Sequence, residues 1–360
     1  MFRLLAMCLI FLSLNALRSF PVFAQADALP TDAPVYLLQK NRLSQLDVAT
    51  GSPQRIAEFT PLINAERMGS DRVDRRLWAA DIDPMGRYLY QVEAWGRSTN
   101  WNILNAPTGA ELVRIDLATN EREIVFDRTT VFDFVLSPDG QRMVVFYYVE
   151  EYLHSRQNAC ILELQTLGCE VLDFENVGMA EWLSSKTFLV RSADINPLQV
   201  IDAENGESQT LVFPPEWQIY WGTRLPKTHS LLVSGQPYEN ALQHPIHFLI
   251  YDLDSGNVEF LPYTAPNTVE YITVNELQLS PNAGYLLYKG FNTALVNFES
   301  GELIEEFTSI YSAGWIDDKT LIVQGSRAEG QLEIMRVNAA SGEITTLVSG
   351  ESASGMLLFP

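Results

Sequence analysis

Residues 132–146 read Phe-Asp-Phe-Val-Leu-Ser-Pro-Asp-Gly-Gln-Arg-Met-Val-Val-Phe, and this stretch indicates how the whole chain is built. Apolar residues lie on both sides of a Ser-Pro-Asp-Gly tetrapeptide, in which Pro presets φ and Gly accepts a positive φ. A tight turn between two apolar strands is a β-hairpin. Similar units recur at residues 80–90, 182–190, 225–233, 277–288 and 315–323.

A second kind of hairpin alternates with the first and is usually closed by glycine. Its clearest copy is Ile-Tyr-Asp-Leu-Asp-Ser-Gly-Asn-Val-Glu-Phe at residues 250–260. The other copies lie at residues 46–56, 113–125, 161–172, 200–211, 295–305 and 335–346. The pair of hairpins recurs with a period of roughly 40 to 50 residues, which is the length of one four-stranded propeller blade.

The repeats predict an all-β fold, a single β-propeller of about seven four-stranded antiparallel blades over residues 27–360. Six or eight blades are the alternatives. The first blade begins in mid-unit at Tyr36, and the chain ends in a lone apolar strand at residues 355–359. We therefore expect the N- and C-terminal strands to share one blade and so close the ring.

The Ser-Pro-Asp-Gly hairpin followed by an Asp-Leu-x-x-Gly hairpin resembles the WD40-like repeats of TolB-type propellers. It also resembles the propellers that precede the hydrolase domain in prolyl-oligopeptidase relatives. The resemblance covers nearly all of the chain after residue 26 and depends on turn residues. It departs from both families, because we expect neither the N-terminal domain of TolB nor a hydrolase domain in this chain. It implies a rigid scaffold, often used for protein contacts, and it transfers no active-site residue.

The N-terminus has the pattern of a secretory signal peptide. Arg3 is followed by an apolar run at residues 4–14, and Val22-Phe23-Ala24 places small residues at a cleavage site, with Ala24-Gln25-Ala26 as the alternative. The apolar run is too short to span a bilayer comfortably. We expect residues 1–26 to be removed and the mature protein to be extracytoplasmic, either periplasmic or secreted, with no transmembrane anchor.

The charge balance restricts the class of partner. The chain has 24 Lys and Arg against 45 Asp and Glu, for a net charge of −21. A field of this sign repels nucleic acid and anionic membranes, so we expect no nucleic-acid partner.

Cys160 and Cys169 are the cysteines that remain after loss of the signal peptide. An oxidising compartment favours a disulfide between them. However, a hairpin turn at residues 166–168 would place them about three residues, or roughly 10 Å, out of register. A disulfide does not reach that far, so the expected register argues against the bond.

Strand direction predicts which face of the ring is functional. Turns within hairpins should lie on one face, and the connections between hairpins on the other. The turns are uniformly short, whereas the connections at residues 60–77, 93–110, 149–159, 213–222 and 235–246 are long and unlike one another. Long variable loops on a rigid scaffold are the usual location of binding sites.

These connections contain aromatic residues and an arginine cluster that form our candidate binding site. The candidates are Arg72, Arg75, Arg76, Trp95, Arg97, Trp101, Tyr152, Trp217, Tyr220, Trp221 and Tyr238. Aromatic rings would anchor a protein or a glycan, and the arginines would bind an anionic group. The alternative is that the rings fill gaps between blades and that the arginines pair with nearby acidic residues.

Sequence motifs for catalysis or metal binding are weak. His244 and His247 would point to opposite faces of a strand. Asp81 and Asp83 are either a carboxylate pair or caps of turn amides. Residues 350–355 miss the Gly-x-Ser-x-Gly pattern by one residue. We assign no catalytic residue, cofactor or metal site.

The sequence therefore favours a monomeric exported scaffold that binds another extracytoplasmic protein, a glycan or an anionic ligand. The alternative is a propeller enzyme (a hydrolase, a lyase or a lactonase-like enzyme) with its site in the central channel. Such a site is assembled from scattered residues and leaves no linear motif.

Overall fold

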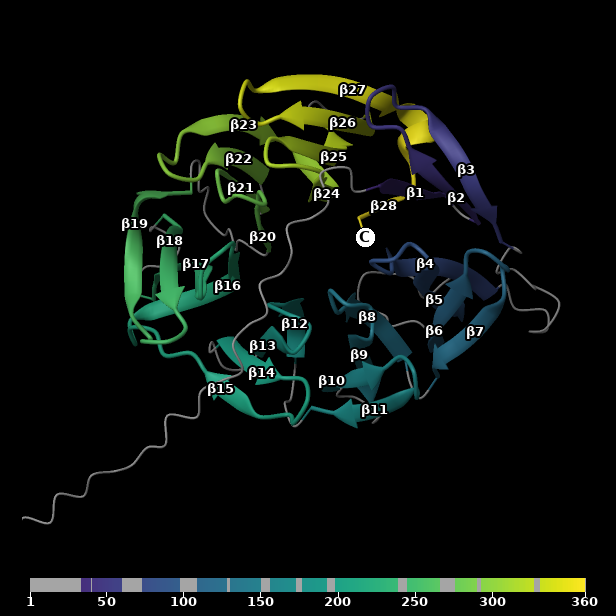
Figure 1. Ribbon diagram of the computed structural model, residues 1–360, viewed down its shortest axis with the longest axis horizontal. Coiled ribbons are helices and arrows are strands. Elements are labelled where there is room, and N and C mark those ends of the chain that lie inside the picture. The colour runs from purple at the N-terminus through teal and green to yellow at the C-terminus, as the bar shows by residue number, and fades with distance from the viewer. Residues whose placement is uncertain are drawn as a thin grey trace, which may run out of the picture.

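The computed structural model describes residues 34–39, 41–59, 73–97, 109–127, 130–149, 156–172, 177–192, 198–238, 245–265, 276–289, 293–326 and 331–359. These residues form seven four-stranded antiparallel sheets arranged as the blades of a ring (Figure 1). The predicted all-β propeller with seven blades is confirmed. No helix in these ranges has the length and apolar character needed to cross a membrane.

Each blade runs outward from the central axis through four hydrogen-bonded strands. From the axis outward, blade 1 contains β28 (Met356–Leu358), β1 (Val35–Gln39), β2 (Arg42–Leu46) and β3 (Pro53–Glu58). Blade 2 contains β4 (Val73–Ile82), β5 (Tyr88–Arg97), β6 (Gly109–Asp116) and β7 (Arg122–Phe126). Blade 3 contains β8 (Thr130–Leu136), β9 (Arg142–Val149), β10 (Arg156–Glu163) and β11 (Gly168–Val171).

Blade 4 contains β12 (Val177–Trp182), β13 (Thr187–Ser192), β14 (Leu198–Asp202) and β15 (Ser208–Thr210). Blade 5 contains β16 (Trp217–Leu225), β17 (Ser230–Pro237), β18 (His247–Asp252) and β19 (Val258–Thr264). Blade 6 contains β20 (Glu276–Leu279), β21 (Tyr285–Lys289), β22 (Thr293–Asn297) and β23 (Leu303–Phe307). Blade 7 contains β24 (Ser309–Trp315), β25 (Thr320–Ser326), β26 (Glu333–Asn338) and β27 (Glu343–Ser349), and a short 3-10 helix, η3 (Gly350–Ala353), follows it.

The same turn joins the third and fourth strands of every blade. In blade 5 the backbone carbonyl of Asp252 accepts a hydrogen bond from the amide of Gly256 at 2.8 Å, and the Asp252 carboxylate accepts one from the amide of Ser255. The residue that donates to the carbonyl has a positive φ in all seven blades: Gly51, Asn120, Leu167, Gly206, Gly256, Gly301 and Gly342. Glycine adopts this conformation without strain, so the glycine-closed hairpins in the sequence locate these turns.

In blades 2, 3 and 6 the turn between the first and second strands is fixed by a side chain at its first residue. The Ser137 hydroxyl accepts a hydrogen bond from the amide of Arg142 at 3.0 Å, and Ser280 binds Tyr285 in the same way at 3.1 Å. Asp83 replaces serine in blade 2, and its carboxylate accepts hydrogen bonds from the amides of Arg87 and Tyr88. The capping alternative for Asp83 is therefore confirmed.

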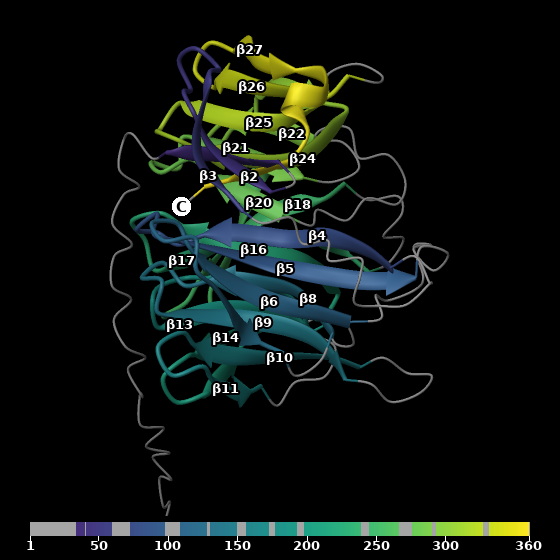
Figure 2. The ribbon, with the colours of Figure 1, turned by 90° about the vertical axis from the view of Figure 1, so that its right-hand side faces the viewer.

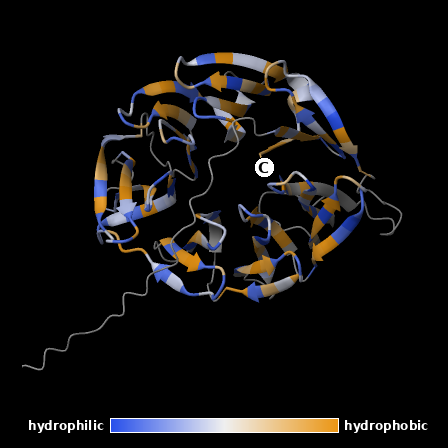
Figure 3. Cartoon of the chain, viewed as in Figure 1, coloured by the Kyte–Doolittle hydropathy of each residue, from blue (hydrophilic) through white to orange (hydrophobic). Residues whose placement is uncertain are grey.

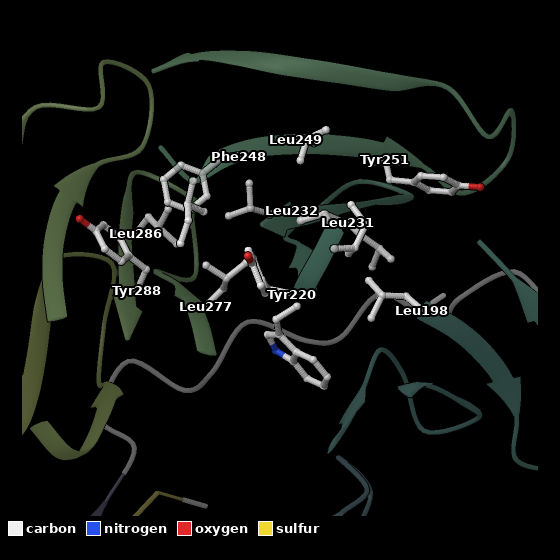
Figure 4. Close-up of a cluster of buried hydrophobic side chains, with 14 of the residues drawn as sticks. Leu198, Tyr220, Leu231, Leu232, Phe248, Leu249, Tyr251, Leu277, Leu286 and Tyr288 are labelled. Atoms are coloured by element: carbon white, nitrogen blue, oxygen red, sulfur yellow. The ribbon is translucent and has the colours of Figure 1, made fainter. Parts of the chain in front are cut away.

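Apolar side chains fill the space between neighbouring blades. Apolar and polar residues alternate around the whole ring (Figure 3). At the junction of blades 5 and 6, Phe248 faces Tyr288 with ring centroids 5.6 Å apart, within a large buried cluster (Figure 4). Each sheet is thus covered on both faces by its neighbours, which a blade could not achieve alone.

The ring is closed by pairing between the two ends of the chain. β28 pairs antiparallel with β1, with Leu37 opposite Leu357. The side-chain amide of Gln39 donates to the carbonyls of Ser352 and Ser354, and the buried amide of Gln324 donates to those of Ala353 and Gly355. The predicted closure by N- and C-terminal strands is confirmed, and two glutamine amides hold the closing segment in place.

The expected register of Cys160 and Cys169 was wrong. The turn between β10 and β11 lies at residues 164–167, because Glu163 pairs with Gly168. In this register the cysteines are diagonal neighbours, and the right-handed twist of a hairpin shortens one diagonal. Their Cα atoms are 5.8 Å apart, and they form a disulfide.

We predict that Gln324→Leu weakens ring closure. The variant leaves the carbonyls of Ala353 and Gly355 without a donor, which should lower the free energy of unfolding by about 1 to 3 kcal/mol. Urea denaturation followed by tryptophan fluorescence measures this change. Gln165→Leu, in the exposed β10–β11 turn, is the control and should change it by less than about 0.5 kcal/mol. Equal stability of the two variants would contradict the assigned role of Gln324.

Candidate functional site

The topology separates the two faces of the ring. In blades 2 to 7, tight turns join the first strand to the second and the third to the fourth. In blade 1 the first two strands are the two ends of the chain, and a tight turn joins the third strand to the fourth. All these turns lie on one side, which we call the hairpin face. The remaining connections leave from the other side, the connection face. Figure 2 shows β4 and β5 from the side, with β5 ending at the connection face. Most residues of the long connections lie outside the described ranges, but the strand ends that lead into them are described.

Blade 2 brings part of the predicted arginine cluster to the connection face. Arg75 pairs with Trp95, and Arg97 pairs with Val73, at the connection ends of β4 and β5. Arg76 lies on β4 beside them. The sequence analysis placed these residues in loops, and this was wrong, because β4 and β5 extend to include them. The remaining candidates in this half of the chain are outside the described residues: Arg72, Trp101 and Tyr152.

Blade 5 contributes a row of rings near the connection face. The Trp217 ring lies 5.3 Å from the His247 ring and 4.9 Å from the Phe260 ring. Gly235 of β17 lies between them, and a Cβ added there would be 2.8 Å from the Gln218 carbonyl oxygen and 2.9 Å from Ile219 Cδ1. Glycine therefore permits the close approach of β16 to β17 beside this tryptophan. Tyr238, just after β17, is 48% exposed, so this region presents aromatic surface to solvent.

Tyr220 and Trp221 lie in the same strand but are only 3% exposed. Both belong to the apolar cluster between blades. The Tyr220 backbone carbonyl accepts a hydrogen bond from the Arg191 guanidinium at 2.7 Å, and burial lowers the pKa of Arg191. The gap-filling alternative therefore describes the packing of these two rings.

The innermost strands share a β-bulge that the sequence analysis missed. In five blades, one residue within the innermost strand has no partner on the second strand. This residue always lies five positions before the residue that begins the turn between these two strands. These residues are Trp78, Phe132, Gly178, Tyr220 and Tyr311. Bulges redirect side chains at the rims of sheets. Tyr311 is 70% exposed, so this bulge adds an accessible ring at the connection end of β24. The signal was present in the sequence as an aromatic residue at a fixed distance from four turns.

Carboxyl groups with raised pKa values line the innermost strands of blades 2 and 3. Burial raises the pKa of Asp81 to about 7, and the nearby charges of Asp133 and Asp83 add to the increase. The surrounding protein raises the pKa of Asp133 to about 6, although solvent reaches this side chain. The Asp81 carboxylate accepts a hydrogen bond from the Ile82 amide at 2.8 Å. The Asp133 carboxylate accepts one from the Phe134 amide at 2.9 Å. Both groups therefore titrate near neutral pH.

Glu181 connects blades 4 and 5. Its carboxylate accepts hydrogen bonds from the Thr223 hydroxyl, the Trp221 side chain and the Arg224 amide. Burial nevertheless raises the pKa of Glu181 to about 7, and the charge of Glu276 contributes to the increase. Because its acceptor positions are used by blade 5, Glu181 is a structural link between the two blades.

The described residues do not bring three or more His, Cys, Asp or Glu side chains into a group that could hold a metal ion. His247 lies on β18 within the aromatic row, and His244 is outside the described residues.

Fold and repeats together define a seven-bladed β-propeller. No protein-family model matches the sequence, and no curated protein matches it. Solved structures match through the fold. An oligogalacturonate lyase in complex with manganese is 12% identical, covers 92% of this chain and 96% of its own, and has a TM-score of 0.56. The Myceliophteria thermophila Cps50 (Swd1) β-propeller domain is 12% identical, with coverage of 91% and 98% and a TM-score of 0.50.

TolB from Acinetobacter baumannii is 13% identical, covers 92% of this chain and 68% of its own, and has a TM-score of 0.48. At these identities the comparisons show the fold. The predicted resemblance to WD40-like propellers is confirmed at that level.

We predict that the stability contributed by the protonated Asp81 side chain is lost as pH rises from about 4 to 8. The raised pKa of Asp81 means that the folded state binds a proton more tightly than the unfolded chain, so its contribution is complete below about pH 4 and is lost through pH 7. At pH 8, Asp81→Asn should be more stable than the parent by about 1 to 2 kcal/mol.

Chemical denaturation at pH 5 and pH 8 measures this difference. Asp318→Asn, at an exposed position in the β24–β25 turn, is the control and should follow the parent at both pH values. A destabilising effect of Asp81→Asn at pH 8 would show that the Asp81 carboxylate stabilises the fold as an anion.

Proposed function

We propose that this chain is an exported β-propeller that binds another extracytoplasmic protein through its connection face. Exposed aromatic side chains at this face support the proposal most directly. Tyr311 and Tyr238 are 70% and 48% exposed. Trp217 is half-buried and pairs with Pro237, the residue before Tyr238. Exposed tyrosines and tryptophans are the residues that contribute most binding energy at protein interfaces.

We also assign the arginines of blade 2 to the proposed binding surface. Arg75, Arg76 and Arg97 lie at the connection ends of β4 and β5 in a protein of net charge −21. Arginines in this setting would bind an acidic group on the partner through paired hydrogen bonds. A glycan with an anionic group would use the same residues and is the alternative ligand.

Export is the second element of the proposal. Residues 1–26 have the charge, apolar run and cleavage pattern of a secretory signal. The disulfide between Cys160 and Cys169 supports the same conclusion, because such bonds persist in oxidising compartments and are rare in the cytosol.

A channel enzyme is the second candidate function. The pKa values of about 7 for Asp81 and about 6 for Asp133 support it, because general acids and bases work best near the operating pH. The two groups lie on neighbouring innermost strands, and the fold is similar to that of a lyase.

We predict that a photo-reactive residue at the connection face captures the partner protein. Tyr311→p-benzoylphenylalanine and Tyr238→p-benzoylphenylalanine, expressed in the native host, should each give a defined adduct on irradiation. Met85 is the matched control, because it lies in the β4–β5 turn of the hairpin face and is 85% exposed. Adducts of equal yield at Met85, or none at either tyrosine, would contradict binding at the connection face and favour the channel enzyme.

We also predict that the mature protein begins at Gln25 or Asp27 and contains one disulfide. Intact-mass analysis of protein recovered from the extracytoplasmic fraction should show the corresponding loss of mass. Labelling with a thiol reagent before reduction should leave Cys160 and Cys169 unmodified. A full-length protein with reactive thiols in the cytoplasmic fraction would contradict export.

A further inference from the structure

The turn between the third and fourth strands of blade 4 differs chemically from its six copies. In the other blades the residue before the positive-φ position is serine or threonine, and its hydroxyl accepts a hydrogen bond from the backbone amide two residues later. In blade 4 that residue is Asn205, whose side-chain carbonyl oxygen accepts the equivalent bond from the Glu207 amide at 2.8 Å. A side-chain amide has a carbonyl carbon that a nucleophile can attack, and a hydroxyl has none.

Gly206 places a nucleophile beside this carbonyl carbon. Asn205 and Gly206 form the one Asn-Gly pair in the sequence. Glycine has no Cβ, so no side chain shields the backbone nitrogen of Gly206 from the Asn205 amide. Asn205 is exposed, so water reaches the same group. The turn therefore brings together the reactants that loss of the amide requires.

We propose that Asn205 is a site of spontaneous deamidation. The backbone nitrogen of Gly206 attacks Cγ of Asn205 and closes a succinimide ring, and the Asn205 side-chain nitrogen leaves as ammonia with the proton of the Gly206 amide. Water then opens the ring at either of its carbonyl carbons, which forms one carboxyl group and restores one amide N–H. The product is an aspartyl residue or an isoaspartyl residue, in which the main chain passes through the former side chain.

The conformation of the turn stabilises the first step. Negative charge develops on the Asn205 side-chain oxygen during the attack, and the Glu207 amide already donates a hydrogen bond to this oxygen. A preorganised donor of this kind stabilises a tetrahedral intermediate. The Gly206 amide donates to the Asp202 carbonyl at 2.9 Å, so this second bond must open before Gly206 reacts.

We expect this opening to be easier in blade 4 than in the other blades. The outermost strand of blade 4, β15, has three residues and is the shortest outermost strand of the ring (Figure 1). Three residue pairs join it to β14. Segments with few backbone hydrogen bonds open locally at much less than the free energy of global unfolding.

Deamidation changes both the charge and the length of the turn. Both products add a carboxylate to a turn that already contains Asp202, Glu204 and Glu207. The isoaspartyl product also lengthens the main chain by one carbon atom. The Asp202 amide donates to the Glu207 carbonyl at 2.9 Å, and the Gly206 amide donates to the Asp202 carbonyl, so the two bonds fit a loop of fixed length. We therefore expect the isoaspartyl product to release β15 from β14.

Ageing of the purified mature protein at pH 8, followed by peptide mass spectrometry, tests the proposal. The peptide that contains Asn205 should gain one mass unit with time, and fragmentation should identify isoaspartate at this position. Asn257 lies in the corresponding turn of blade 5 and precedes the β-branched Val258, so conversion at Asn205 should be at least about tenfold faster. Unchanged mass at Asn205, or equal conversion of Asn257, would overturn the proposed site.

Asn205→Ser is the matched control, because serine occupies this position in blades 5, 6 and 7. Hydrogen exchange reports the release of β15 through the Leu211 amide, which donates to the Leu198 carbonyl at 2.9 Å. Ageing should reduce protection of this amide in the parent in proportion to isoaspartate, and should leave it unchanged in Asn205→Ser. Equal loss of protection in the aged variant, or full protection in the isoaspartyl protein, would overturn the coupling of deamidation to β15. Neither measurement depends on partner binding at the connection face.

Discussion

The antiparallel pairing of β28 with β1 joins the last blade to the first and gives every sheet two neighbours. Without it, blades 1 and 7 would each expose an apolar face, since propeller blades are stable through contact with their neighbours. The pairing is short, and the amides of Gln39 and Gln324 reinforce it at the segment that precedes β28. Gly355 is required there, because a Cβ would lie 2.5 Å from the Leu38 carbonyl oxygen.

Closure also determines where chemistry can occur. A ring of outward-running blades leaves the edges of seven innermost strands around the axis and places the recurring turn between the third and fourth strands of every blade on one face. The surrounding blades leave Asp81 and Glu181 half-buried, and this desolvation raises their pKa values. The same closure creates the junction between blades 7 and 1, where side chains distant in sequence, Leu46 and Ile334, belong to one buried apolar cluster.

The turns could be predicted from sequence because their causes are local. Pro-Asp-Gly and the positive-φ glycines act within a few residues, and seven copies give the blade count. The disulfide was missed because a small change in turn position alters the register of Cys160 and Cys169. The burial of Trp221 and the row formed by Trp217 and Phe260 depend on neighbouring strands, which a linear pattern does not specify.

Unfolding of a shortened chain that lacks residues 350–360 tests whether ring closure holds the fold together. Equilibrium urea denaturation of this chain and of the full chain, followed by circular dichroism and fluorescence, gives the midpoint and cooperativity of each. We expect the shortened chain to lose the single cooperative transition and to unfold at much lower urea, because blade 1 loses its innermost strand, β28, and the link from blade 7 to blade 1. A shortened chain with the same midpoint and the same slope as the full chain would contradict this account.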